Sequence, residues 1–83
     1  MPTVAIVDGI KIQFFAREHP PSHFHAVSAE YRALIDIETL RVLKGKLPPA
    51  ILSKVRSWAE PRRAALKHAW DQVQARRTPE RIR

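Results

Sequence analysis

The chain has no cysteine among its 83 residues, which excludes a disulfide framework, a thiolate zinc site and a cysteine nucleophile. It has only two glycines, Gly9 and Gly45, and neither has the neighbours of a glycine-rich phosphate-binding loop. No apolar run approaches the roughly 18 residues that cross a bilayer, and no basic signal-peptide segment precedes the first apolar stretch. From these absences we expect a soluble, cytoplasmic protein without a membrane partner.

Positive charge, by contrast, is abundant and unevenly distributed. The net charge is +7. Residues 1–40 contain three Lys or Arg and five Asp or Glu, which gives a net charge of −2. Residues 41–83 contain twelve Lys or Arg and three Asp or Glu, which gives a net charge of +9. A basic half of this kind suits RNA, DNA or an acidic protein partner. It is equally compatible with an ordinary solvated helix surface followed by a basic tail.

Alternating apolar residues predict a β-hairpin near the N-terminus. Segments 3–7 and 10–15 flank Asp8-Gly9, a dipeptide that supplies the two positive φ angles of a type I′ turn. The two-residue loop predicts a register in which Val7 pairs with Ile10, Ala5 with Ile12 and Thr3 with Phe14.

A second hairpin is predicted from segments 23–28 and 31–38, which flank Ala29-Glu30. Pro20-Pro21 stiffens the loop before it into an extended backbone. The cross-strand pairs predicted by a two-residue loop are Phe24 with Ile35, Ala26 with Ala33 and His23 with Asp36. A shift by one residue would place both histidines among the isoleucines, so the apolar pattern itself favours this register.

The C-terminal half changes to helical periodicity. Segment 39–43 can add a short fifth strand before a turn at Lys44-Gly45-Lys46. Beyond Pro48 the apolar residues recur at helical spacing, at Ile51, Leu52, Val55, Trp58, Ala59, Leu66, Ala69, Trp70 and Val73. Pro61 either starts a second helix or kinks a continuous one. We therefore expect a single α+β domain over residues 1–76, with helical structure packed on a small antiparallel sheet, and a basic, frayed tail over residues 77–83.

Three of the four histidines, His19, His23 and His25, lie within seven residues. On a strand, His23 and His25 project from the same face, and His19 can complete a set of three nitrogen ligands for a transition metal such as zinc. Asp36, predicted opposite His23, can be a further ligand or can orient the imidazole. Without a metal, the same four residues can provide a general acid and base for phosphodiester chemistry. The histidines are also compatible with a role as ordinary surface residues.

Two further surfaces are candidates for binding. The candidates for nucleic-acid binding are the basic residues of the predicted second helix, Arg62, Arg63, Lys67 and Arg76. The second face of the first hairpin is too apolar to be left wholly in water, and its residues Val4, Ile6 and Phe15 are candidates for a partner interface. The partner there is either another protein or a second copy of the chain.

Three segments, 2–15, 18–26 and 35–40, resemble DUF4160, a bacterial family of uncharacterised proteins. The second segment contains the motif His-Pro-Pro-x-His-Phe-His. The resemblance extends to Gly45-Lys-Leu-Pro48, Trp58-Ala59, Leu66 and Trp70. Ser22 departs from the pattern, since a third proline is common there. Members of the family are small proteins often encoded beside another short protein, as in toxin–antitoxin gene pairs. The resemblance therefore implies a cognate protein partner encoded by a neighbouring gene, but no established chemistry.

These observations favour a component of a toxin–antitoxin-like module that acts on RNA or translation through the histidine-rich loop. One alternative is a non-enzymatic module of the antitoxin or regulator side, which binds nucleic acid or a partner protein. Another is a small protein with a structural metal. The sequence does not decide whether the protein is an enzyme, because it completes no nucleophile, carboxylate pair or phosphate loop.

Overall fold

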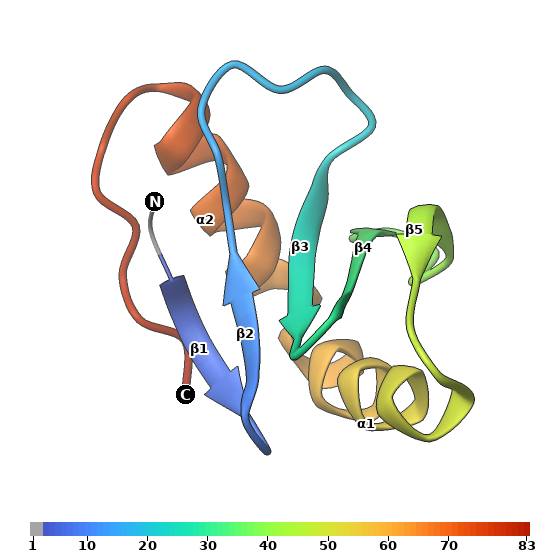
Figure 1. The fold of residues 1–83 in the computed structure, drawn as a ribbon. Coiled ribbons are helices and arrows are strands. Elements are labelled where there is room, and N and C mark those ends of the chain that lie inside the picture. The colour runs from blue at the N-terminus through green and yellow to red at the C-terminus, as the bar shows by residue number, and fades with distance from the viewer. Residues whose placement is uncertain (1–2) are drawn as a thin grey trace.

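The computed structural model describes residues 3–83, and its first half is a five-stranded antiparallel sheet (Figure 1). The strands are β1 (Thr3–Val7), β2 (Ile10–Gln13), β3 (His23–Ser28), β4 (Tyr31–Asp36) and β5 (Val42–Lys46). Each strand pairs with the next along the chain, in the order β1-β2-β3-β4-β5. A helical region follows, so the α+β prediction is confirmed.

The first hairpin has the predicted turn and most of the predicted register. Asp8 and Gly9 both have positive φ angles, of 48° and 81°, as a type I′ turn requires. Val7 pairs with Ile10, and Ala5 pairs with Ile12. The predicted pairing of Thr3 with Phe14 is wrong.

A β-bulge between Thr3 and Ala5 causes this difference. The extra residue on β1 makes Thr3 pair with Gln13 instead of Phe14. The bulge also turns Val4 inward together with Ala5, so that Val4 is only 1% exposed. The prediction that Val4 contributes to an outer partner interface is therefore corrected, because Val4 belongs to the hydrophobic core.

The second hairpin has the predicted register throughout. Phe24 pairs with Ile35, Ala26 with Ala33 and His23 with Asp36. The two-residue loop is made possible by Ala29, which adopts a positive φ angle of 49°.

The strand β4 ends two residues earlier than predicted. Asp36 Oδ1 accepts hydrogen bonds from the backbone N–H groups of Glu38 and Thr39, at 2.7 and 3.0 Å, and so stabilises a turn. The fifth strand therefore begins at Val42 and not at Thr39. Lys44 and the two residues after it lie within β5 and do not form the predicted turn.

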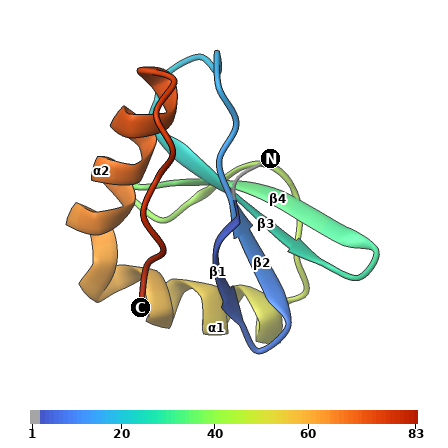
Figure 2. The same ribbon diagram turned by 90° about the vertical axis from the view of Figure 1, so that its left-hand side faces the viewer.

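The helical region consists of α1 (Pro49–Ala59), a 3₁₀ turn η1 (Glu60–Arg62) and α2 (Arg63–Gln74). The 3₁₀ turn contains Pro61, whose ring has no N–H to donate and cannot continue an α-helix. The prediction of a kink or break near this proline is confirmed. The two helices consequently meet at a steep angle (Figure 2). No helix within residues 3–83 is long and apolar enough to cross a membrane.

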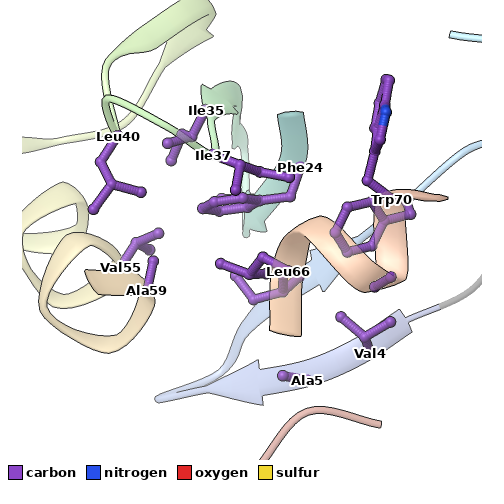
Figure 3. Packing of buried hydrophobic residues seen from close by; sticks show 14 of the residues in the cluster. Val4, Ala5, Phe24, Ile35, Ile37, Leu40, Val55, Ala59, Leu66 and Trp70 are labelled. Atoms are coloured by element: carbon purple, nitrogen blue, oxygen red, sulfur yellow. The ribbon is translucent and has the colours of Figure 1, made fainter. Parts of the chain in front are cut away.

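Both helices cover one face of the sheet and form the core with it. Phe24 and Ile35 from the sheet meet Val55 and Ala59 of α1 and Leu66 of α2 (Figure 3), and all five are fully buried. Burying a large apolar side chain of this kind stabilises the fold by about 1.5–3 kcal/mol.

The opposite face of the sheet is open over most of its area. Its residues alternate with the core residues and are exposed or half-buried, namely Lys11, Gln13, His25, Val27, Arg32, Leu34, Lys44 and Lys46. We call this set the open face. At one end it is covered, where Trp70 of α2 lies against His23 and where Phe15 and Glu18 contact His25.

The C-terminal segment 77–83 contacts the domain, although its composition predicts a frayed tail. It runs back beside β1 (Figures 1 and 2), where the Ile82 N–H donates to the Val4 carbonyl at 2.8 Å. The Ile82 side chain packs against the core. Arg62 Nε donates to the Arg83 carbonyl at 2.8 Å. The Ile82 side chain and these two hydrogen bonds therefore anchor a segment whose charge alone favours solvent.

Candidate metal centre

Three potential metal ligands meet where the loop between β2 and β3 returns to the sheet. His23 and His25 project from β3, and Glu18 comes from the loop. Glu18 Oε1 lies 3.2 Å from His23 Nε2 and 2.6 Å from His25 Nε2. One ligand atom from each of the three residues lies within 4.8 Å of the others. The group is well shielded, since His23 is 5% exposed and its two partners are half-buried.

The orientation of the His23 ring is fixed by the backbone. His23 Nδ1 lies 2.8 Å from the Pro21 carbonyl oxygen, which can only accept a hydrogen bond. The proton of a neutral ring is therefore on Nδ1, and the lone pair of Nε2 points at the Glu18 carboxylate. Two acceptor atoms do not make a stable contact unless a hydrogen or a metal ion lies between them. Either a hydrogen shared between the two groups or a metal ion can fill that position.

The end of α2 holds the loop and the rings in place. The Gln74 side-chain amide donates to the Phe15 carbonyl at 3.0 Å, and its oxygen accepts from the Glu18 N–H at 3.3 Å. The Trp70 ring lies 4.9 Å from the His23 ring, centroid to centroid. Because Trp70 and Gln74 are four residues apart, they lie on the same face of the helix. One helix face therefore supports both the strand and the loop of the candidate centre.

The aromatic ring of Phe15 supports the second histidine. Phe15 meets the His25 ring edge to face, with 4.3 Å between centroids. Phe15 is half-buried, and among the predicted partner-interface residues only Ile6 is largely exposed, at 57%.

Two predicted members of the histidine site lie outside this group. His19 is exposed and contributes no atom to the cluster. Asp36 is paired with His23 across the strands, but its carboxylate accepts the two turn N–H groups described above. Glu18 takes the place that the sequence assigns to these residues. Its only sequence signal is its position directly before the histidine motif, and Gln74 has no signal at all.

An open hollow of about 310 Å³ lies beside the centre. Glu18 and His25 line it together with Arg32 and Lys44. Leu34 and Gly45 contribute apolar surface. The hollow therefore connects two of the three potential ligands with solvent and with two cations.

The four predicted nucleic-acid-binding cations lie in η1, in α2 and just after α2, and they are only partly available to an outside ligand. Arg62 donates to the Trp58 and Arg83 carbonyls and lies over the Trp58 ring, with 5.1 Å between its Cζ and the ring centroid. Lys67 pairs with Asp71 at 2.9 Å, one turn along the same helix. Arg63 and Arg76 are exposed.

The chain belongs to the DUF4160 family, a domain of unknown function, whose family model matches residues 9–71. The matched range includes the three potential ligands and Trp70, and it ends before Gln74. No curated protein and no solved structure matches the chain.

Proposed function

We propose that this member of the DUF4160 family binds a divalent transition metal ion, such as zinc, through Glu18, His23 and His25. The observation that carries the proposal is the His23 ring, whose Nδ1 lies 2.8 Å from the Pro21 carbonyl while Nε2 faces a carboxylate at 3.2 Å. Histidines that ligate metals commonly donate their second ring N–H to a carbonyl or carboxylate in this way.

One of the separations between ligand atoms already fits a metal ion of this size. Zinc binds imidazole nitrogen and carboxylate oxygen at about 2.0–2.2 Å, so two ligands of a tetrahedral site are about 3.3 Å apart. Glu18 Oε1 and His23 Nε2 already have this spacing, at 3.2 Å. His25 Nε2 lies 2.6 Å from the same oxygen, and its ligand atom lies within 4.8 Å of the one on His23, so a side-chain rotation of His25 is needed to bring all three ligand atoms to this spacing.

A set of two histidines and one carboxylate is typical of catalytic metal sites, because it leaves a coordination position for water or substrate. A bound zinc ion supplies Lewis-acid polarisation of a substrate oxygen and activation of a water molecule. The same ligand set also suits iron(II). The hollow beside Glu18 and His25 gives a substrate access to this position.

Calorimetric titration of the metal-free protein with zinc, and in parallel with iron(II) under anaerobic conditions, tests the proposal. We expect one ion per chain, and we expect Glu18→Gln and His25→Ala each to abolish binding. The matched controls are His19→Ala and His68→Ala, since both histidines are exposed and outside the cluster. Equal loss in the controls, or full binding by Glu18→Gln, contradicts the proposal.

We further propose that the metal centre is the active centre of a toxin–antitoxin-like module component that acts on RNA or translation. Support comes from the open coordination position and from the charge of +9 over residues 41–83. Expression of the chain alone should slow bacterial growth, co-expression of the neighbouring gene should restore it, and Glu18→Gln should remove the toxicity. A harmless chain that instead neutralises a toxic neighbour favours the antitoxin or regulator alternative.

In either case we propose that the cognate protein covers Ile6, the largest exposed apolar residue of the first hairpin. Strand β1 is at the edge of the sheet, and an apolar side chain exposed there favours association. Ile6→Lys should weaken co-purification with the neighbouring gene product while leaving zinc binding intact.

A further inference from the structure

The open face carries four cations in two neighbouring rows. Lys11, Arg32 and Lys46 lie in one cross-strand row, with Val27 between the first two. Lys44 lies in the next row, in register with Leu34 and His25. All four cations are exposed. The rows therefore place positive charge directly beside the candidate metal centre.

This charge is not neutralised within the described part of the chain. Arg32 lies directly opposite Lys46, and like charges in such a pair repel each other across about 5 Å. The ion pairs formed by residues 3–83 involve other side chains, and none includes a cation of the open face. An arrangement that costs stability in the free protein becomes favourable once an anion binds.

The hollow connects these cations with the metal centre. Arg32 and Lys44 line it together with Glu18 and His25. An anionic group in the hollow can therefore contact both cations and also approach the ligand atoms.

The cations extend further than one small anion can reach. Lys11 is on β2 and Lys46 on β5, three strand spacings apart, which corresponds to about 14 Å. A single phosphate or carboxylate can occupy only part of that distance. A chain of repeating phosphates can contact all of it.

We propose that the open face binds the phosphodiester backbone of a nucleic acid, with one phosphate in the hollow between Arg32, Lys44 and the metal centre. The placement of that phosphate beside a metal ion rests on the proposed function. The binding of the backbone to the open face is argued from the two rows of cations alone. The proposal assigns nucleic-acid binding to the sheet and not to the basic residues of the helical region and the segment that follows it.

Fluorescence anisotropy with labelled RNA and DNA oligonucleotides, single- and double-stranded, tests the proposal with the full chain. The open-face variant is Arg32→Gln/Lys44→Gln, and the matched control is Arg63→Gln/Arg76→Gln, which removes the same charge from exposed positions on the helical side. At low salt we expect the open-face variant to lose about tenfold or more in affinity, with a salt slope smaller by about 1.4–1.8. The control should stay close to the wild type.

Several results overturn the inference. They are an equal loss in both variants, or a larger loss in the Arg63→Gln/Arg76→Gln control. The absence of nucleic-acid binding at low salt, or equally tight binding of polyglutamate, also overturns it. Zinc titration of the same proteins separates this inference from the proposed function. Zinc binding without nucleic-acid binding overturns the inference alone. A selective loss in the open-face variant without zinc binding supports the cation rows and overturns the metal centre.

Discussion

At the scale of single residues, the candidate centre depends on side chains whose partners are far away in the sequence. His23 and His25 could be paired from their spacing, because a strand places alternate residues on one face. Glu18 could not be assigned in the same way, because its loop is held by Gln74, which lies 56 residues further along the chain. Periodicity predicts which face of an element a residue occupies, but it does not predict the path of an irregular loop.

Gln74 is therefore expected to act as a positioning residue. Gln74→Ala removes the hydrogen bonds to the Phe15 carbonyl and the Glu18 N–H, so the loop that presents the carboxylate loses its anchor on α2. Zinc affinity should fall about tenfold or more, as is usual when a group that orients a metal ligand is removed.

Calorimetric titration with zinc measures this effect. Gln72→Ala is the matched control, since Gln72 is on the same helix and its side-chain oxygen has no partner within the described residues. If both variants bind zinc as tightly as the wild type, Gln74 does not position the centre.

At the scale of the elements, the sequence predicts the strands and helices better than their ends. Asp8-Gly9 and the alternation of apolar residues are sufficient to locate the first hairpin. The bulge at Thr3 has no comparable signal, and it reverses the orientation of Val4. The turn at Asp36 is stabilised by side-chain hydrogen bonds to the backbone, which secondary-structure propensities do not predict. Because of this turn, β5 begins three residues later than the sequence indicates.

The pairing of β4 with β5 depends on Gly45. This residue has a φ angle of 85°, and a Cβ atom placed on it would collide with the backbone carbonyl of Arg32. Gly45→Ala should lower the free energy of unfolding by about 2 kcal/mol or more, from the backbone strain and the steric overlap together.

Denaturant unfolding of Gly45→Ala and Gly9→Ala separates these two contributions. Gly9 has a similar φ angle of 81°, but nothing lies within 4 Å of a Cβ atom placed there. Gly9→Ala should therefore report the backbone strain alone, about 1–2 kcal/mol. Equal losses in the two variants would mean that β4 and β5 separate without cost to accommodate the methyl group.

At the scale of the whole molecule, the two faces of the sheet have different tasks. One face packs against both helices and forms the core, whereas the open face carries the cations. The candidate centre lies where the two meet, because Trp70 and Gln74 at the end of α2 reach the loop and the first residues of β3. A ligand of the centre therefore joins the helical layer, the loop and the sheet, and its binding should stabilise all three together.

This coupling predicts a metal-dependent melting temperature. A ligand that binds only the folded state adds about 2.7 kcal/mol at one hundred times its dissociation constant. For a domain of this size, each kcal/mol raises the melting temperature by about 4–8 °C. Zinc should therefore raise the melting temperature of the wild type by about 10–20 °C over the protein in EDTA.

His25→Ala should show no such increase, whereas His19→Ala, which keeps all three ligands, should show the full increase. Thermal unfolding followed by circular dichroism measures the difference, and an equal zinc effect on His25→Ala would place the bound metal outside the Glu18, His23 and His25 cluster.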